Sequence, residues 1–241
     1  MEKRAFTLAE VLITLVIIGV IAALTIPNLI AKHEKDETVT KLKKLYSTLA
    51  QAYSLSVLDN GPVEDWNVGK YTVEQNLNKF IIPYLKVEKV CNRDNITECT
   101  SFDRVTLKGQ SSAYLSPTTT TSPAFAAFRL QDGTILWAYL TGGIIMAADI
   151  NGDAKPNKLG RDTFWFVYST RNIPADSTWS NKKFHVGKPG FYLWGENNPR
   201  EDLTSTNFDN CSKKATSVIP GGHCGALIKL DGWQIKDDYP W

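Results

Sequence analysis

Residues 1–30 read MEKRAFTLAEVLITLVIIGVIAALTIPNLI, a short basic leader followed by a long apolar run that contains one acid, Glu10. As an α-helix, residues 6–30 would span about 37 Å, enough to cross a hydrocarbon core of about 30 Å. The sequence therefore predicts one membrane-spanning helix. Lys3 and Arg4 precede this helix. Because basic residues favour the cytoplasmic side, we expect a cytoplasmic N-terminus and an exported C-terminal body.

The apolar segment is expected to stay attached to the mature chain. A secretory signal peptide would carry its small-residue cleavage site after the apolar run, whereas residues 31–37 read AKHEKDE. An ordinary signal anchor would also be retained, but it would leave Glu10 unexplained. An ionised carboxylate at membrane depth costs about 2.5 to 3.5 kcal/mol. Glu10 therefore indicates a function in which another group neutralises its charge.

The stretch AFTLAEVLITL, residues 5–15, resembles the prepilin-type signal of type IV pilins and type II secretion pseudopilins. This resemblance implies cleavage between Ala5 and Phe6 by a prepilin peptidase, followed by N-methylation of Phe6. It also implies that the Glu10 carboxylate meets the Phe6 amine of an adjacent subunit during assembly. Pro27 matches the family's helix-kinking proline, while Ala5 stands where glycine is usual.

The helical pattern continues beyond the membrane segment. Apolar residues recur three and four positions apart from Leu42 to Tyr53, so one helix is predicted to reach about Leu58. The sequence DNGP at residues 59–62 then stops it. The charged stretch over residues 32–44 reads as a solvated helix face, with contact to lipid headgroups as the alternative.

Further along the chain, the signals change from helix to strand. Thr72 and Gln75 fit a capping box, which predicts a second helix over residues 72–86 with a break near Pro83. The later stretch FRLQDGTILWAYL predicts two strands around the DG turn at residues 132–133. The stretches IIMAADI and TFWFVYS predict two more strands.

The C-terminal sequence GALIKLDGWQIK is interpreted as an apolar strand followed by a turn at Gly232. Together these elements predict an α+β fold in which a long N-terminal helix packs on a C-terminal antiparallel sheet. This arrangement matches the type IV pilin-like fold that the resemblance implies. We expect a leader over residues 1–5, the transmembrane and polymerisation half of the helix over 6–30, and one exported body over 31–241.

The loop DINGDAKPNKLGRD, residues 149–162, is the candidate metal site. Its oxygen-bearing side chains suit Ca²⁺, and the candidate ligands are Asp149, Asn151, Asp153, Asn157 and Asp162. The match to an EF-hand loop is partial, since Gly160 takes the place of the twelfth-position glutamate. The resemblance adds support, because type II secretion pseudopilins often carry a calcium loop. The alternative is an Asx-rich turn that bonds its own backbone, with Arg161 or Lys155 pairing the acids.

Four cysteines in an exported chain predict two disulfides. Three pairings are open, and we favour the local ones, Cys91 with Cys99 and Cys211 with Cys224. A zinc site made of Cys211, His223 and Cys224 is the rival interpretation, although adjacent His and Cys side chains diverge. The second pair resembles the disulfide-bounded C-terminal region of many pilins.

Composition and motifs argue against several functions. The 241-residue chain has a net charge of +2, so no strongly basic field points to nucleic-acid binding. Three histidines are present, and no nucleophile motif, phosphate-binding glycine loop or metalloprotease helix accompanies them. We therefore expect no enzyme and no cofactor apart from calcium.

The sequence thus predicts a structural subunit of a type IV pilus or a type II secretion pseudopilus, which polymerises through its N-terminal helix. Expected partners are other pilin or pseudopilin subunits, the prepilin peptidase, the inner-membrane assembly machinery, and the lipid bilayer before assembly. The expected location is the bacterial inner membrane in a single pass, and then a periplasmic or extracellular fibre. The alternative is a minor pilin whose C-terminal body is an adhesive or DNA-binding module, and a tethered enzyme is a third hypothesis.

Overall fold

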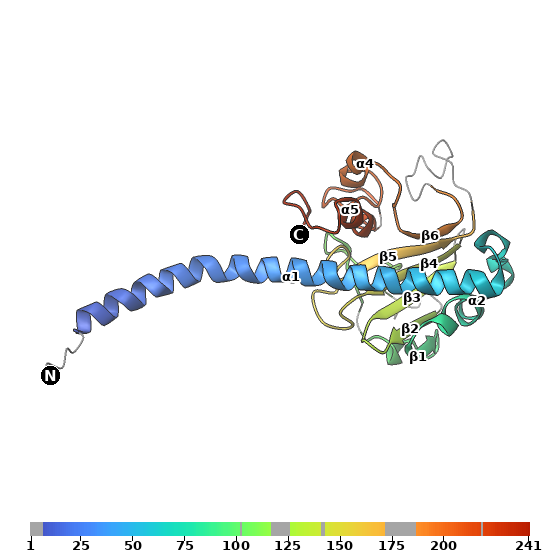
Figure 1. The fold of residues 1–241 in the computed structure, drawn as a ribbon, viewed down its shortest axis with the longest axis horizontal. Helices are drawn as coiled ribbons and strands as arrows, with labels where there is room; N and C mark the ends of the chain where they lie inside the picture. The colour runs from blue at the N-terminus through green and yellow to red at the C-terminus, as the bar shows by residue number, and fades with distance from the viewer. Residues whose placement is uncertain (1–6, 102, 117–125, 141–142, 172–186, 218) are drawn as a thin grey trace. The chain divides into compact units, whose positions relative to one another are not determined.

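The computed structural model describes residues 7–101, 103–116, 126–140, 143–171, 187–217 and 219–241 (Figure 1). The chain divides into two compact units, residues up to Glu37 and Thr38–Trp241, and we call the second unit the body. The described helices and 3₁₀ turns are α1 (Leu8–Asn60), η1 (Val63–Asp65), η2 (Val68–Lys70), α2 (Val73–Phe80), η3 (Ile82–Tyr84), η4 (Ile96–Glu98), α4 (Arg200–Thr204) and α5 (Cys224–Leu230). The strands are β1 (Val87–Asn92), β2 (Ala126–Leu130), β3 (Ile135–Leu140), β4 (Gly143–Asp149), β5 (Thr163–Ser169) and β6 (Gly190–Leu193).

The first unit consists of the N-terminal part of α1. Its large apolar side chains between Leu8 and Ile30 are 44% to 81% exposed, so the helix surface is apolar all round. Within the described parts of the chain, α1 is the one helix long and apolar enough to cross a membrane. A helix that is hydrophobic on every side needs lipid or other helices around it.

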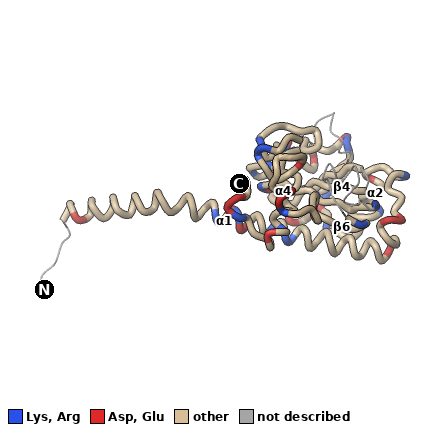
Figure 2. The backbone as a smooth tube through the Cα atoms, turned by 90° about the horizontal axis from the view of Figure 1, so that it is seen from above, with Lys and Arg blue, Asp and Glu red and all other residues tan. Residues whose placement is uncertain are grey.

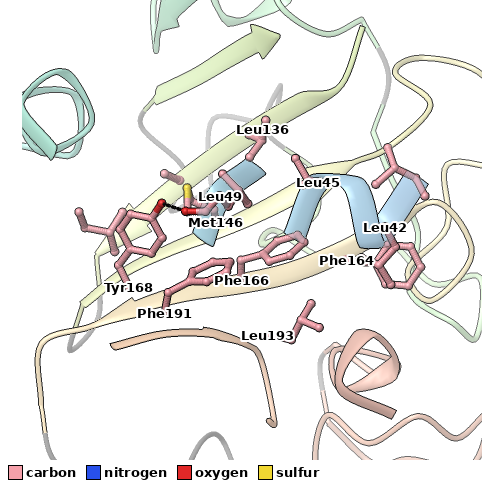
Figure 3. Close-up of a cluster of buried hydrophobic side chains, with 14 of the residues drawn as sticks. Leu42, Leu45, Leu49, Leu136, Met146, Phe164, Phe166, Tyr168, Phe191 and Leu193 are labelled. Carbon is pink, nitrogen blue, oxygen red and sulfur yellow. Dashed lines mark hydrogen bonds between the residues drawn. The ribbon is translucent and has the colours of Figure 1, made fainter. Parts of the chain in front are cut away.

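Within the body, α1 lays an apolar stripe on the sheet. Leu42, Leu45 and Leu49 follow one another at spacings of three and four residues, and all three are buried. The hydroxyl of Tyr168 on β5 donates to the carbonyl of Leu49 at 2.7 Å, as the dashed line in Figure 3 shows. Packing against the sheet therefore fixes the predicted helix–sheet arrangement, and the α+β, pilin-like fold class is confirmed.

The sheet is a six-stranded antiparallel meander in the order β1 to β6. Side chains alternate between its two faces, as the period of two in a strand requires. Phe164, Phe166 and Tyr168 belong to the core cluster that contains the α1 stripe, while Trp165 and Val167 belong to a second cluster. Every residue of β4 and β5 is buried, so the sheet is covered on both faces.

Several predicted local signals are confirmed. Thr72 and Gln75 form a reciprocal capping box at the start of α2, with the Gln75 amide donating to Thr72 Oγ1 at 3.2 Å. The DG turn joins β2 to β3, and Gly133 has the positive φ of 87° that this turn requires. Helix α2 nevertheless ends at Phe80 rather than near residue 86, because the chain turns into η3 around Pro83.

The C-terminal segment corrects the sequence-based prediction, because Cys224–Leu230 forms the helix α5 instead of a strand. The run GALI is too short for periodicity to separate a buried helix from a buried strand. Gly225 brings α5 close to the sheet, since a Cβ there would lie 2.9 Å from a methyl carbon of Leu193. The predicted turn at Gly232 is present, with φ of 78°.

Candidate functional site

Glu10, the acid in the apolar segment, lies in the first turn of α1. Its Oε2 accepts two hydrogen bonds from Thr7, from the backbone amide at 2.9 Å and from the hydroxyl at 2.8 Å. The Glu10 amide in turn donates to Thr7 Oγ1 at 3.3 Å. This is a reciprocal capping box of the T-x-x-E type. It was not predicted from the sequence, although the spacing of Thr7 and Glu10 indicates it. One carboxylate oxygen of Glu10 thus caps the helix.

Of the other residues of the predicted processing and assembly site, the structure describes Pro27 but not Ala5 and Phe6. Ala5 and Phe6 lie outside the described residues. Pro27 lies inside α1, which continues through it to Asn60. Since proline has no backbone N–H, one hydrogen bond of the helix ladder is missing at this position.

The candidate metal loop is built around an arginine that comes from outside it. Arg104 is fully buried, and its Nε donates to Asp149 Oδ2 at 2.8 Å. Its NH2 group donates to Asp153 Oδ1 at 3.2 Å and to the carbonyl of Gly152 at 3.3 Å. The guanidinium also lies 5.2 Å from the ring centroid of Trp137 on β3. Burial raises the pKa of the Asp149 carboxyl, and the charge and hydrogen bond of Arg104 oppose that rise.

A second arginine and the first disulfide complete this cluster. Arg129 on β2 donates to Asp153 Oδ2 at 3.3 Å and to the carbonyl of Cys99 at 2.7 Å. Thr100 donates to Asp153 at 2.9 Å and accepts a hydrogen bond from Arg104. The Cys91–Cys99 disulfide ties this segment to β1. Two guanidinium groups from outside the loop therefore pair the acids at its start.

The far end of the loop closes on its own backbone. Asp162 accepts the amides of Asn157 and Lys158, each at 2.6 Å, so both of its carboxylate oxygens are used. Burial raises the pKa of Asp162, and these backbone hydrogen bonds lower it. The side-chain oxygens of Asn151 and Asn157 are buried without a protein hydrogen bond. This half of the loop matches the Asx-rich turn that the sequence offered as the alternative.

The donor set does not fit a calcium ion as the organiser of this loop. Ca²⁺ needs about six to eight oxygen ligands, several of them charged. Asp149 and Asp153 already face the cation Arg104, and the two free amide oxygens of Asn151 and Asn157 carry no charge. Within the described residues, no group of three or more His, Cys, Asp or Glu side chains is arranged to hold a metal ion.

The second disulfide joins Cys211 to Cys224, which opens α5. The predicted local pairing is thus the one that the structure contains, and the rival zinc site loses both of its thiolates. His223 is buried beside this disulfide, with Nδ1 2.7 Å from Asn210 Oδ1. The carboxylate of Asp209 is also buried there and accepts from the Trp194 indole at 3.3 Å. These groups fix the C-terminal region and present no open reactive site.

A pocket of about 520 Å³ opens between α4 and α5, lined by Glu196, Asn197, Asn198, Pro199, Leu203, Ala226, Lys229 and Leu230. Its one basic group is already engaged, because Lys229 Nζ lies 2.5 Å from Glu196 and donates to the hydroxyl of Tyr46 at 2.6 Å. The pocket therefore offers an ion pair at its wall and no nucleophile or metal ligand set.

Comparison with known proteins separates the two parts of the chain. Residues 28–241 match a family of unknown function (DUF6613). The chain belongs to this family. Membership in DUF6613 covers the whole body, including the arginine-centred loop and both disulfides. A second family, the prokaryotic N-terminal methylation motif, matches residues 1–26, which contain Ala5, Phe6 and Glu10.

The relatives of this DUF6613 member with curated descriptions resemble it over a short region. It is 35% identical over 68 residues to the type II secretion system core protein G of Escherichia coli (strain K12), which is 28% of this chain and 46% of that protein. It is 38% identical over 59 residues to the core protein G of Pectobacterium carotovorum subsp. carotovorum, covering 24% and 37% of the two chains. The chain thus spans less than half the length of these relatives.

No solved structure matches this DUF6613 member. The methylation motif and the two core proteins confirm the resemblance to type IV pilins and type II secretion pseudopilins.

Proposed function

We propose that this protein is a structural subunit of a type IV pilus or a type II secretion pseudopilus, assembled through the N-terminal part of α1. The observation that carries the proposal is the methylation motif at residues 1–26 together with an apolar helix surface that the described residues of the single chain leave exposed. Large apolar side chains that are 44% to 81% exposed on every face of a helix require either lipid or neighbouring helices. The role is mechanical rather than catalytic.

Processing and location follow from the same proposal. A prepilin peptidase cleaves between Ala5 and Phe6, and Phe6 is then N-methylated. The precursor sits in the inner membrane in a single pass, with Lys3 and Arg4 on the cytoplasmic side. The assembly machinery then moves the subunit into a periplasmic or extracellular fibre. N-terminal sequencing from cells with and without the peptidase tests this step, and a mature chain that keeps Met1 would overturn it.

In the fibre, Glu10 pairs with the Phe6 amine of the adjacent subunit. The geometry of the helix cap supports this pairing, because both hydrogen bonds from Thr7 go to one carboxylate oxygen of Glu10, Oε2. Two opposite charges attract strongly in a bundle of low dielectric constant, whereas a lone buried charge is costly. Assembly thereby selects the register that brings the two groups together.

Two matched variants separate this pairing from helix capping. Glu10→Gln keeps the capping-box geometry, because glutamine also serves at this position, but it removes the negative charge. Thr7→Ala removes the cap and keeps the charge. We expect Glu10→Gln to insert into the membrane and fail to enter fibres, while Thr7→Ala still assembles. Fibre yield after shearing measures the difference. Equal assembly of both variants would overturn the pairing, and failure of both would point to the cap.

A further inference from the structure

Basic side chains from two distant segments meet at one corner of the body. Lys158 and Arg161 follow the arginine-centred loop, and Lys213 and Lys214 follow Cys211. Burial lowers the pKa of Lys158, and the positive charges of Lys213 and Arg161 lower it further. Lys213 also donates to the C-terminal Trp241 at 3.2 Å, and the Arg161 guanidinium stacks 3.7 Å above the Trp241 ring. We call these four cations and Trp241 the basic patch.

The basic patch lies beside the first residue of the body. The hydroxyl of Thr38 donates to the carbonyl of Arg161 at 3.2 Å. Thr38 comes eight residues after Ile30, where the apolar segment ends, and eight helical residues cover about 12 Å. The patch therefore lies at the end of the body where the chain arrives from the apolar segment. Figure 2 shows blue basic segments close to the C-terminus, with red acidic ones among them.

Acids also occur near the patch in the sequence of the body. Asp237 and Asp238 come shortly before Trp241, and Asp238 pairs with Arg200. The patch itself gathers four basic side chains on a protein whose overall net charge is only +2.

We propose that the basic patch binds anionic phospholipid headgroups and so holds the body against the membrane before assembly. This inference rests on the proposed function, because it requires an inserted N-terminal helix. Each lysine or arginine near an anionic surface strengthens binding roughly fivefold, and the effect falls off within a Debye length of about 10 Å. Tryptophan is enriched at the boundary between lipid and water, where its ring and its N–H are both satisfied.

The test uses the full chain in proteoliposomes, either of neutral phosphatidylcholine or of phosphatidylcholine with phosphatidylglycerol. Resistance to carbonate extraction reports insertion of the helix. Amide hydrogen exchange in residues 211–217 and 236–241 reports contact of the patch. We expect exchange in these peptides to be slower on phosphatidylglycerol than on neutral lipid, and 0.5 M salt, about three times the physiological strength, should remove the difference.

Matched double variants sharpen the result. Lys213→Gln/Lys214→Gln should weaken headgroup binding roughly 30-fold and return exchange to the neutral-lipid level. The control, Lys70→Gln/Lys79→Gln, changes two exposed lysines of η2 and α2 and should keep the protection. Equal exchange on both lipids with a carbonate-resistant chain overturns the lipid inference alone. Release of the chain by carbonate overturns the membrane-anchored subunit as well.

Discussion

The Arg104 guanidinium and the Asp149 carboxylate form an ion pair of 2.8 Å in which neither side chain is exposed to solvent. The pair joins two segments that are 45 residues apart in the sequence, and Asp153 and Gly152 add further acceptors to the same guanidinium. A buried pair of this kind contributes little by its charge attraction alone, because both ions lose water. Its importance lies in what happens when one partner is removed.

Replacing Arg104 should therefore strongly destabilise the body. Arg104→Met leaves Asp149 buried without its counter-charge, and we expect the free energy of unfolding to fall by about 3 to 5 kcal/mol. Urea unfolding measures the change. Lys44→Met serves as the control, because Lys44 pairs with Asp132 at 2.7 Å while the two side chains are 65% and 40% exposed. Its loss should cost less than about 1 kcal/mol. Similar losses for the two variants would contradict the role given to Arg104.

Calcium should leave the stability of the body unchanged, because arginines already balance the acids of the loop. At 5 mM calcium, a site with a dissociation constant near 50 µM would add about 2.7 kcal/mol to the unfolding free energy. We expect thermal unfolding in 5 mM calcium and in chelator to coincide. A rise in melting temperature with calcium would show that the loop binds the ion after all, and would favour the ligands predicted from the sequence.

Asp209 should make the body less stable as pH rises from 4 to 7. Burial raises the pKa of this carboxyl to about 6, against hydrogen bonds from Ser217 and Trp194 that lower it, whereas its value in the unfolded chain is about 3.9. Between these values the folded state holds a proton that the unfolded state has lost. The stabilisation is thus complete below pH 4 and lost by pH 7, with a total of roughly 3 kcal/mol.

Asp209→Asn isolates this effect from other acids, because the amide keeps an acceptor for the Trp194 indole and cannot ionise. As pH rises from 4 to 7, the unfolding free energy of the wild type should fall relative to that of the variant. A difference that stays constant over this range would show that Asp209 titrates normally in the folded body.

Two glycines with the same backbone conformation should respond differently to alanine. Gly61 and Gly160 both have φ of 80°, so alanine is strained at each by about 1 kcal/mol. A Cβ at Gly61 meets nothing within 4 Å, whereas at Gly160 it would lie 2.8 Å from Cys224 Sγ. We expect Gly160→Ala to cost at least about 1 kcal/mol more than Gly61→Ala, since overpacking a rigid neighbour adds to backbone strain. Equal losses would mean that the disulfide can move aside.

Local signals predicted much of the fold correctly. The spacing of Leu42, Leu45 and Leu49 predicted the face that α1 buries, and the DG turn predicted the β2–β3 hairpin. The strand β1 was missed, since its sequence VEKVCN carries two charges and only one of its residues is buried. The helix α5 was mistaken for a strand because its run of buried apolar residues is too short for periodicity to separate the two.

The candidate metal loop shows that local sequence signals are limited in the same way when they are used to predict a site. Its acids were found from their spacing, but the partners that decide their chemistry were not. Arg104 and Arg129 reach Asp153 from 49 and 24 residues away. Nothing in the local sequence around Arg104 distinguishes a buried arginine from an exposed one. By contrast, the T-x-x-E spacing of Thr7 and Glu10 is a purely local signal, and it is sufficient to predict their capping box.

The outer strand β1 carries a consequence for contacts between copies of the body. Its register with β2 shifts between Val87 and Lys89, and the exposed side chains there are Glu88 and Lys89. A bulge and charges on an outer strand discourage the edge-to-edge sheet merging that leads to amyloid-like aggregates. Neighbouring bodies can thus lie side by side without their sheets pairing at this edge.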